Sequence, residues 1–173
     1  TTDTDLAIER LLAGKCRQTF FSAAIGGTFL FQRMICSEYA VARPQKIIAL
    51  NDSVTSFVLS RMEKENKNLE QAIHEAQWER LAGGNPSQNL HGIVTRSRLV
   101  LQIAQIFGYM VKPDQIPTSG ISSLAVDDVR IAAEIGYSIR LLGMAQNDDG
   151  VLKVLVEPCM IPSRYLLAQV RGG

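Results

Sequence analysis

The sequence feature that most constrains the fold is a pair of β-like runs, residues 138–145 and 151–157, joined by the turn-rich segment QNDDG. Apolar and β-branched runs separated by so short a polar connection are typical of a β-hairpin. A hairpin is an antiparallel pair of strands. The chain is therefore neither all-helical nor built on a purely parallel sheet.

Most of the remaining chain shows helical periodicity. Residues 46–50 form an apolar run that predicts a short buried strand, and the side-chain oxygens of Asn51, Asp52 and Ser53 are suited to capping a helix that follows. A capping box at Asn68 and Gln71 predicts a second helix that ends near residue 82, with an apolar stripe at 69, 72, 73 and 76. Two more helices are expected before the glycines at 108 and 136.

These elements predict an α+β domain in which a mixed sheet is covered by helices. With 173 residues, of which 46% are hydrophobic, we expect one domain spanning residues 1–173 with a single core. Residues 83–89 (GGNPSQN) have no apolar period and predict a loop, and loops of this kind often carry functional sites.

Composition excludes several classes of function. A formal charge of +1 gives no field for binding nucleic acid or an anionic membrane. The longest apolar run, residues 19–31, is interrupted and is too short to span a bilayer, and the acidic start is unlike a secretory signal, so we expect a cytoplasmic protein. Three scattered cysteines and two histidines indicate neither a disulfide framework nor a metal site, and the absence of a G-x-G-x-x-G loop predicts no bound cofactor.

The C-terminal half resembles one family. Residues 126–143 (VDDVRIAAEIGYSIRLLG) are similar to the D-I-x-x-A-x-E-L-G-Y-x-I-K-L-L-G segment of the homoserine dehydrogenases, and residues 156–162 and 167–172 resemble its V-x-P-x-L-I-P and L-A-x-V-x-G segments. Residues 52–62 lie without gaps on the family's N-G-T-T-N-Y-I-L-T-x-M helix start. The resemblance covers roughly residues 20–172 and is strongest over residues 45–172.

The resemblance implies a substrate-binding domain whose sheet also forms a homodimer interface. It implies a substrate pocket that faces a separate nicotinamide-binding Rossmann domain, which this sequence does not include. It also implies a monovalent-cation site near residues 21–28, but Phe21 or Ser22 replaces a family glutamate there and Phe29 replaces a proline.

Pro86 and Gly92 fix the register of the family's catalytic segment on this chain. In that register, the family's tyrosine, its acidic residues and its catalytic lysine are all replaced in this chain. The residues that stand in their places are Leu81, Gly83, Asn85, Asn89, His91, Val94 and Arg98. Carboxylates have become neutral side chains or a histidine, and the lysine has become a guanidinium that is always protonated. The resemblance therefore predicts the place of the site but disfavours ordinary homoserine oxidation.

Each replaced residue has a functional and a structural interpretation. His91 and Arg98 are the candidate catalytic residues, since imidazole titrates near neutrality and guanidinium binds oxyanions. Asn85 and Asn89 are candidate hydrogen-bonding groups for a substrate, in a pocket that Gly83, Val94 and Leu81 would line. The alternative is that they are ordinary turn and surface residues.

Three functions remain open from the sequence. The first is a repurposed domain that binds a small organic ligand, with possible cofactor-free cyclisation or isomerisation in the old substrate pocket. The second is a non-catalytic dimeric or regulatory protein. The third is a divergent or split oxidoreductase that is completed by a nucleotide domain.

Overall fold

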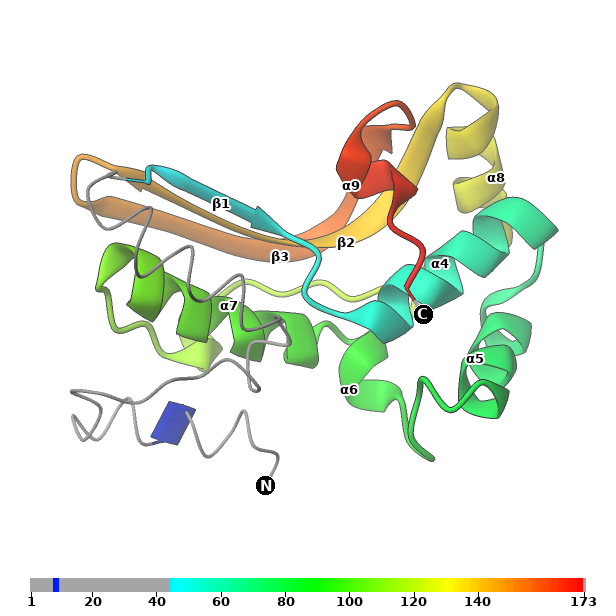
Figure 1. Cartoon of the computed structure of the whole chain (residues 1–173), viewed down its shortest axis with the longest axis horizontal. Coiled ribbons are helices and arrows are strands. Elements are labelled where there is room, and N and C mark those ends of the chain that lie inside the picture. The colour runs from blue at the N-terminus through cyan, green and yellow to red at the C-terminus, as the bar shows by residue number, and fades with distance from the viewer. Residues whose placement is uncertain (1–7, 10–43, 173) are drawn as a thin grey trace.

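The computed structural model describes residues 8–9 and 44–172 of the chain. The hypothesis on the cation site near residues 21–28 lies outside these residues. Along the described chain the elements are β1 (Lys46–Ala49), α4 (Ser53–Glu65), α5 (Leu69–Trp78), α6 (Ser87–Leu90), α7 (Ile93–Phe107), a 3-10 turn (Pro113–Gln115), α8 (Val126–Glu134), β2 (Tyr137–Asp148), β3 (Val151–Pro162) and α9 (Leu166–Gln169) (Figure 1). None of the helices in this part of the chain is both long and apolar enough to cross a bilayer.

The predicted hairpin forms two of the three strands of the sheet. Strands β2 and β3 pair antiparallel from Tyr137 with Pro162 to Asp148 with Val151, so each is longer than the sequence indicated. The turn between them is Asp149–Gly150, whose φ angles are 49° and 94°. Two-residue turns with two positive φ values are favoured in hairpins because their backbone twist matches that of the strands. The predicted connection at residues 146–150 was therefore too long.

Strand β1 completes a sheet of order β1-β2-β3, in which it pairs antiparallel with β2. A bridge between Thr118 and Val156 is the one parallel pairing among the described residues. The α+β prediction is confirmed.

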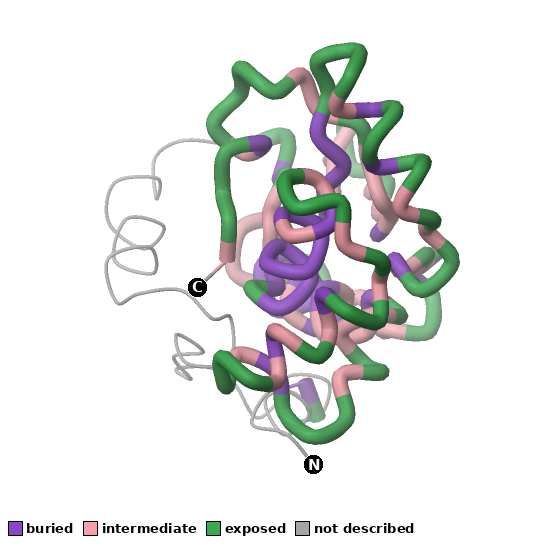
Figure 2. The backbone as a smooth tube through the Cα atoms, turned by 90° about the vertical axis from the view of Figure 1, so that its right-hand side faces the viewer, coloured by how far each residue is buried: buried purple, intermediate pink, exposed green. Residues whose placement is uncertain are grey.

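Helices pack against the sheet, and α9 contacts β2 and β3 on the side opposite α7 (Figure 1). Helices α4, α7 and α8 contact β2, and α7 lies under the sheet in Figure 1. Figure 2 shows the buried backbone gathered in the interior, with exposed segments around it. The core is built mainly from apolar side chains of α4, α7 and the two long strands, among them Val58, Leu59, Met62, Leu99, Ile103, Leu141 and Val156.

The first helix boundaries follow their sequence signals. The Asp52 carboxylate accepts a hydrogen bond from the Val54 amide at 3.1 Å, which confirms it as the cap of α4. Asn68 and Gln71 form the predicted capping box, with bonds of 2.9 and 3.1 Å. Gly108, in the left-handed region at φ 72°, ends α7 as predicted.

Helix α5 is shorter than predicted. It ends at Trp78 rather than near residue 82, because Arg80 adopts φ 58° and the amides of Leu81 and Ala82 both bond back to the Ala76 carbonyl. Trp78 is 87% exposed, so it is not a core residue.

The segment predicted as a loop contains a helical turn. Residues 87–90 form α6, with Pro86 at its N-cap position, and the Asn85 side chain just before it accepts a hydrogen bond from the Ser87 amide at 3.0 Å. The polar composition of residues 83–89 concealed this short helix, since four residues carry no apolar period. The Gly83–Gly84 stretch before it is open and exposed.

The C-terminal segment returns to the start of α4. A Cβ placed on Gly172, at φ 60°, would lie 2.3 Å from the Ser53 carbonyl oxygen and 2.7 Å from the Phe57 nitrogen. Only a glycine allows this approach. The last described residues therefore pack directly on the first turn of α4, which Figure 1 also shows.

Candidate functional site

Two residues at the junction of β1 and α4 gather the polar side chains of the site. The amide side chain of Asn51 forms a closed pair with that of Gln102 on α7, with bonds of 2.9 and 2.8 Å. Both residues are buried. A buried amide pair that satisfies itself holds α7 against the end of β1.

Arg98 joins the same junction from α7. Its Nη1 donates a hydrogen bond to the Asn51 carbonyl oxygen. Arg98 lies one turn before Gln102, so both side chains project from one face of α7 towards Asn51. The residue predicted as catalytic is thus half-buried and anchored to backbone, rather than free at a surface.

Asp52 is the carboxylate of this cluster. Its side chain is buried, and the Asn89 amide nitrogen donates to both carboxylate oxygens at 3.0 and 3.1 Å. With the cap bond from Val54, Asp52 fixes the α6 segment to the start of α4. The negative charge is also stabilised by the positive end of the α4 dipole.

Gly143 on β2 lies next to the cluster, on its sheet side. A Cβ at this position would meet the Asn51 amide nitrogen at 3.3 Å, the Thr95 methyl at 3.4 Å and Leu99 at 3.5 Å. Gly143 therefore lies where α7 approaches β2 closely, and a larger residue would fit there only with small shifts of these side chains. We define the junction cluster as Asn51, Asp52, Asn89, Arg98 and Gln102.

The structure brings together only part of the predicted site. Asn89 and Arg98 converge on the junction cluster. His91 and Asn85 do not reach it: both are exposed, and the His91 Nδ1 lies 2.8 Å from the Ser87 carbonyl oxygen within its own short helix.

The other three residues of the predicted pocket are apolar or small, and none of them forms a side-chain hydrogen bond with the cluster among the described residues. Leu81 is half-buried against the core, and Val94 is half-buried in the first turn of α7. Gly83 is exposed, with nothing within 4 Å of the position that a Cβ would occupy, and its carbonyl accepts a weak bond from Gln77. Neither Gly83 nor Val94 contributes an ionisable group.

Sequence reasoning missed Asn51 and Gln102 as members of the site. A signal was present, because Gln102 is a polar residue within the apolar face that Leu99 and Ile103 define on α7. The sequence marks Asn51 only as part of a helix cap. Its partner lies 51 residues away, which local patterns do not reveal.

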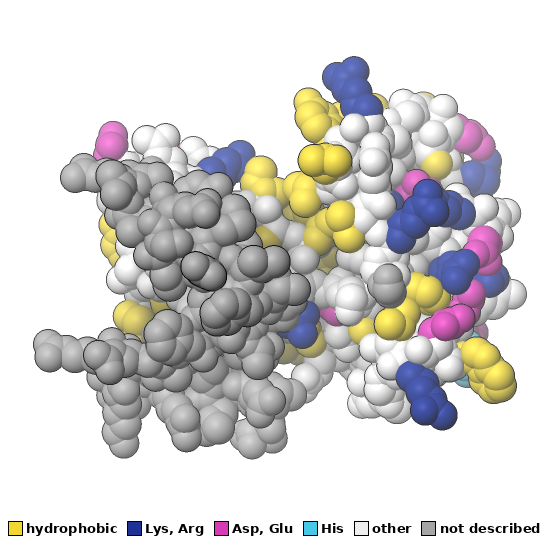
Figure 3. All heavy atoms as spheres, in the orientation of Figure 1, with side chains coloured by type: hydrophobic (Ala, Val, Ile, Leu, Met, Phe, Trp, Pro, Cys, Tyr) yellow, Lys and Arg dark blue, Asp and Glu magenta, His cyan; other side chains and the backbone are white. Residues whose placement is uncertain are grey.

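No group of three or more His, Cys, Asp or Glu side chains suited to a metal ion is found within residues 8–9 and 44–172. Basic and acidic side chains are interspersed on the surface around α4 and α5 (Figure 3). They form ion pairs such as Arg61 with Glu65 and Lys67 with Glu75. Hydrogen bonds from Lys67 and Arg61 lower the pKa of Glu65. These exposed pairs contribute little to stability.

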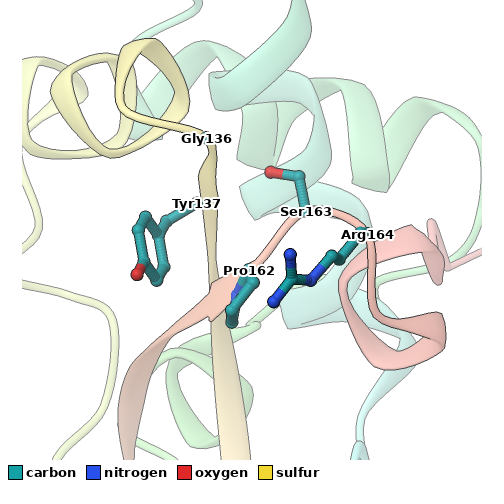
Figure 4. Close-up of a pocket in the computed structure, with 5 residues that line it drawn as sticks. All are labelled: Gly136, Tyr137, Pro162, Ser163 and Arg164. Carbon is teal, nitrogen blue, oxygen red and sulfur yellow. The ribbon is translucent and has the colours of Figure 1, made fainter.

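A hollow of about 240 Å³ lies away from the junction cluster, between the end of α8 and the turn after β3. It is lined by Gly136, Tyr137, Pro162, Ser163 and Arg164 (Figure 4). The Ser163 amide bonds to the Gly136 carbonyl at 2.9 Å, which joins the two turns. None of the residues predicted for the site lines this hollow.

Comparison with known proteins identifies one family. The family model described as homoserine dehydrogenase matches residues 32–173. Among curated proteins, homoserine dehydrogenase of Bacillus subtilis is 25% identical over 153 residues, which is 88% of this chain and 35% of the relative. The enzyme of Helicobacter pylori is 31% identical over 121 residues, 70% of this chain and 29% of the relative.

Solved structures give the same family. A homoserine dehydrogenase from Thiobacillus denitrificans has a TM-score of 0.84 at 27% identity, covering 98% of this chain and 40% of that one. The homoserine dehydrogenase of S. aureus has a TM-score of 0.70 at 27% identity, covering 73% of this chain and 32% of that one. The chain thus spans about a third of the length of the curated relatives that it matches.

Proposed function

Because this chain belongs to the homoserine dehydrogenase family, we propose that its junction cluster binds a small organic ligand and does not support homoserine oxidation. The observation that carries the proposal is the position of Arg98. The resemblance places Arg98 where the family has its catalytic lysine, and here the guanidinium donates to the Asn51 carbonyl. A guanidinium stays protonated, so it cannot take the hydroxyl proton of an alcohol as hydride leaves.

The charges of the cluster support the same conclusion. Homoserine carries an ammonium group, and the acidic residues that the family places at Gly83 and Val94 are replaced by residues without charge. The remaining carboxylate, Asp52, is occupied by the Val54 amide and by Asn89. Within residues 44–172, an ammonium group bound at this cluster would find no free anionic partner.

The side chains of the cluster suit hydrogen bonding and charge stabilisation. Asn89 offers an amide, and Arg98 offers a cation with several donors, while the Asn51–Gln102 pair holds them in place. Such a set orients a ligand and stabilises developing negative charge, which is what a cyclisation or isomerisation requires. The sequence has no G-x-G-x-x-G loop for the pyrophosphate of a dinucleotide, and the resemblance assigns that group to a separate domain.

The test is the homoserine oxidation rate of the full natural protein that contains this chain, with NAD or NADP and the Bacillus subtilis enzyme as a positive control. We expect a rate at least about 100-fold lower than the control, because proton transfer by a positioned group contributes roughly 10²–10⁴-fold. Arg98→Lys should not restore the rate, since the carboxylates at Gly83 and Val94 remain absent. A rate within about tenfold of the control would overturn the proposal and favour a divergent oxidoreductase.

We further propose that the part of the sheet around Ile48, which no described helix covers, pairs with a second copy of this chain. Ile48, Met144 and Leu155 lie side by side across the three strands, and Ile48 is 43% exposed. A groove of about 320 Å³ is lined by Met144 and Leu155 of this row, together with Lys46 and Lys153. The homodimer that the resemblance implies would bury this apolar row.

Sedimentation of the protein tests the pairing. The unmodified chain should sediment as a dimer, and Leu155→Glu should sediment as a monomer because it places a carboxylate in the apolar contact. Leu166→Glu is the matched control, since Leu166 is 82% exposed on α9, away from the row, and should leave the dimer intact. A monomeric unmodified protein would contradict the pairing.

A further inference from the structure

The first turn of α7 has hydrogen-bond donors without acceptors. Gly92, at φ 76°, occupies the N-cap position and provides no side chain to cap the helix. The Arg96 amide bonds to the Gly92 carbonyl at 2.9 Å, but the amides of residues 93–95 have no acceptor within the described part of the chain. The first turn also contains no acidic side chain.

Two side chains add to this surplus of donors. Thr95, in the same turn, is fully buried, and its hydroxyl has no partner among residues 44–172. One turn further, the Nε of Arg98 is buried and unpartnered in that range, as is the Nε of Arg96, which lies on another side of the helix. A helical side chain leans towards the N-terminus of its helix, so the Arg98 side chain extends towards this turn.

No nearby carboxylate balances these donors in the described structure. Val94 stands where the resemblance places a family aspartate, and Asp52 is held by the start of α4 and by Asn89. The positive end of the dipole of α7, a helix of 15 residues, adds to the charge of Arg98. An acceptor-only, negatively charged group is what this arrangement lacks.

We propose that the first turn of α7, together with Thr95 and Arg98, binds the oxyanion of the ligand, a carboxylate or a phosphate. This inference rests on the proposed function and narrows it to acidic ligands. The amides of residues 93–95 and the Arg98 guanidinium donate to the oxyanion, and the Thr95 hydroxyl gains the acceptor that it lacks. This also explains why the family's aspartate is replaced by Val94, because a carboxylate at position 94 would repel a negatively charged ligand.

Titration of the protein with acetate, inorganic phosphate and neutral acetamide, followed by NMR, tests the proposal. Acetate or phosphate should shift the amide signals of residues 93–95 and the Arg98 Nε–H signal, and acetamide should not. The stronger of the two anions identifies the chemical class of the ligand. Added salt should weaken the binding, since the attraction is screened.

Variants separate a built site from general positive charge. Arg98→Gln should weaken anion binding by about 10- to 100-fold, the loss expected for charge-assisted hydrogen bonds. Arg96→Gln removes the same charge about 200° around α7, and should change the affinity by less than about threefold. Thr95→Val, which keeps the shape and removes the hydroxyl, should weaken binding by roughly 3- to 10-fold.

Several outcomes would overturn the proposal. The first is that neither anion shifts the amides of residues 93–95 in the unmodified protein, a result that does not depend on the folding of any variant. The second is that Arg96→Gln weakens binding as much as Arg98→Gln does. If acetamide alone shifts the side-chain amides of Asn51 and Asn89, the oxyanion site fails while ligand binding at the junction cluster stands. Homoserine oxidation by the full protein is a separate result that tests the proposed function alone.

Discussion

Replacing Arg140 with methionine is expected to lower the free energy of unfolding by about 3–5 kcal/mol. Arg140 is 1% exposed on β2, and its Nη1 lies 2.7 Å from a Glu63 carboxylate oxygen. The guanidinium also donates to the carbonyls of Ile139 and Ala168 at 2.8 and 2.5 Å. It therefore links α4, β2 and α9, and its loss leaves the Glu63 carboxylate largely buried without a cation.

Chemical unfolding followed by circular dichroism measures this effect. Arg130→Met is the matched control, because Arg130 pairs with Asp127 and Glu134 on the exposed face of α8 and should contribute about 0–1 kcal/mol. Replacing Glu63 by leucine together with Arg140→Met should recover much of the loss, since no buried charge is then left alone. A loss below about 1 kcal/mol for Arg140→Met would show that the buried pair is not structural.

Gly120→Ala is expected to cost roughly 3 kcal/mol or more in stability, at or above the usual range for overpacking. A Cβ at Gly120 would lie 2.0 Å from the Leu90 carbonyl oxygen and 2.5 Å from the His91 Cα. These are backbone atoms, which cannot rotate aside. The Ile121 amide now donates a hydrogen bond to the Leu90 carbonyl oxygen at 2.7 Å, and the added methyl group would push the two apart.

Thermal unfolding tests this prediction, with Gly83→Ala as the control. Gly83 has nothing within 4 Å of its missing side chain, so its replacement should change stability by about 0.5 kcal/mol or less. In any Gly120→Ala protein that folds, NMR signals of residues 91–95 should also move, because the clash lies at the junction of α6 and α7. An unchanged melting temperature would mean that the chain segment around Gly120 yields without strain.

The sequence predicted the elements that local chemistry determines. The cap at Asp52, the box at Asn68 and Gln71, and the stop at Gly108 are bonds within one turn of a helix, and the structure contains all three. The hairpin was also predicted, although its strands extend further because pairing between strands continues past the apolar runs. The end of α5 was missed, since the left-handed Arg80 follows no residue preference.

The site was predicted less completely, because it depends on distant contacts. The resemblance directed attention to Asn89 and Arg98, and both reach the junction of β1 and α4. It did not reveal that Asn51 and Gln102 hold that junction together. His91 was selected for its chemistry, but its geometry is set by Ser87, a neighbour within α6, and turns it away from the cluster.

The packing of Gly172 on the first turn of α4 bears on how the chain folds during synthesis. Ser53 and Gly172 lie roughly 120 residues apart, so their contact closes one of the longest loops in the domain and forms slowly. A ribosome releases the chain from its N-terminus, and α4 emerges long before the segment that covers it. During synthesis, the first turn of α4 therefore lacks its contact with the C-terminal segment until the residues around Gly172 have been translated.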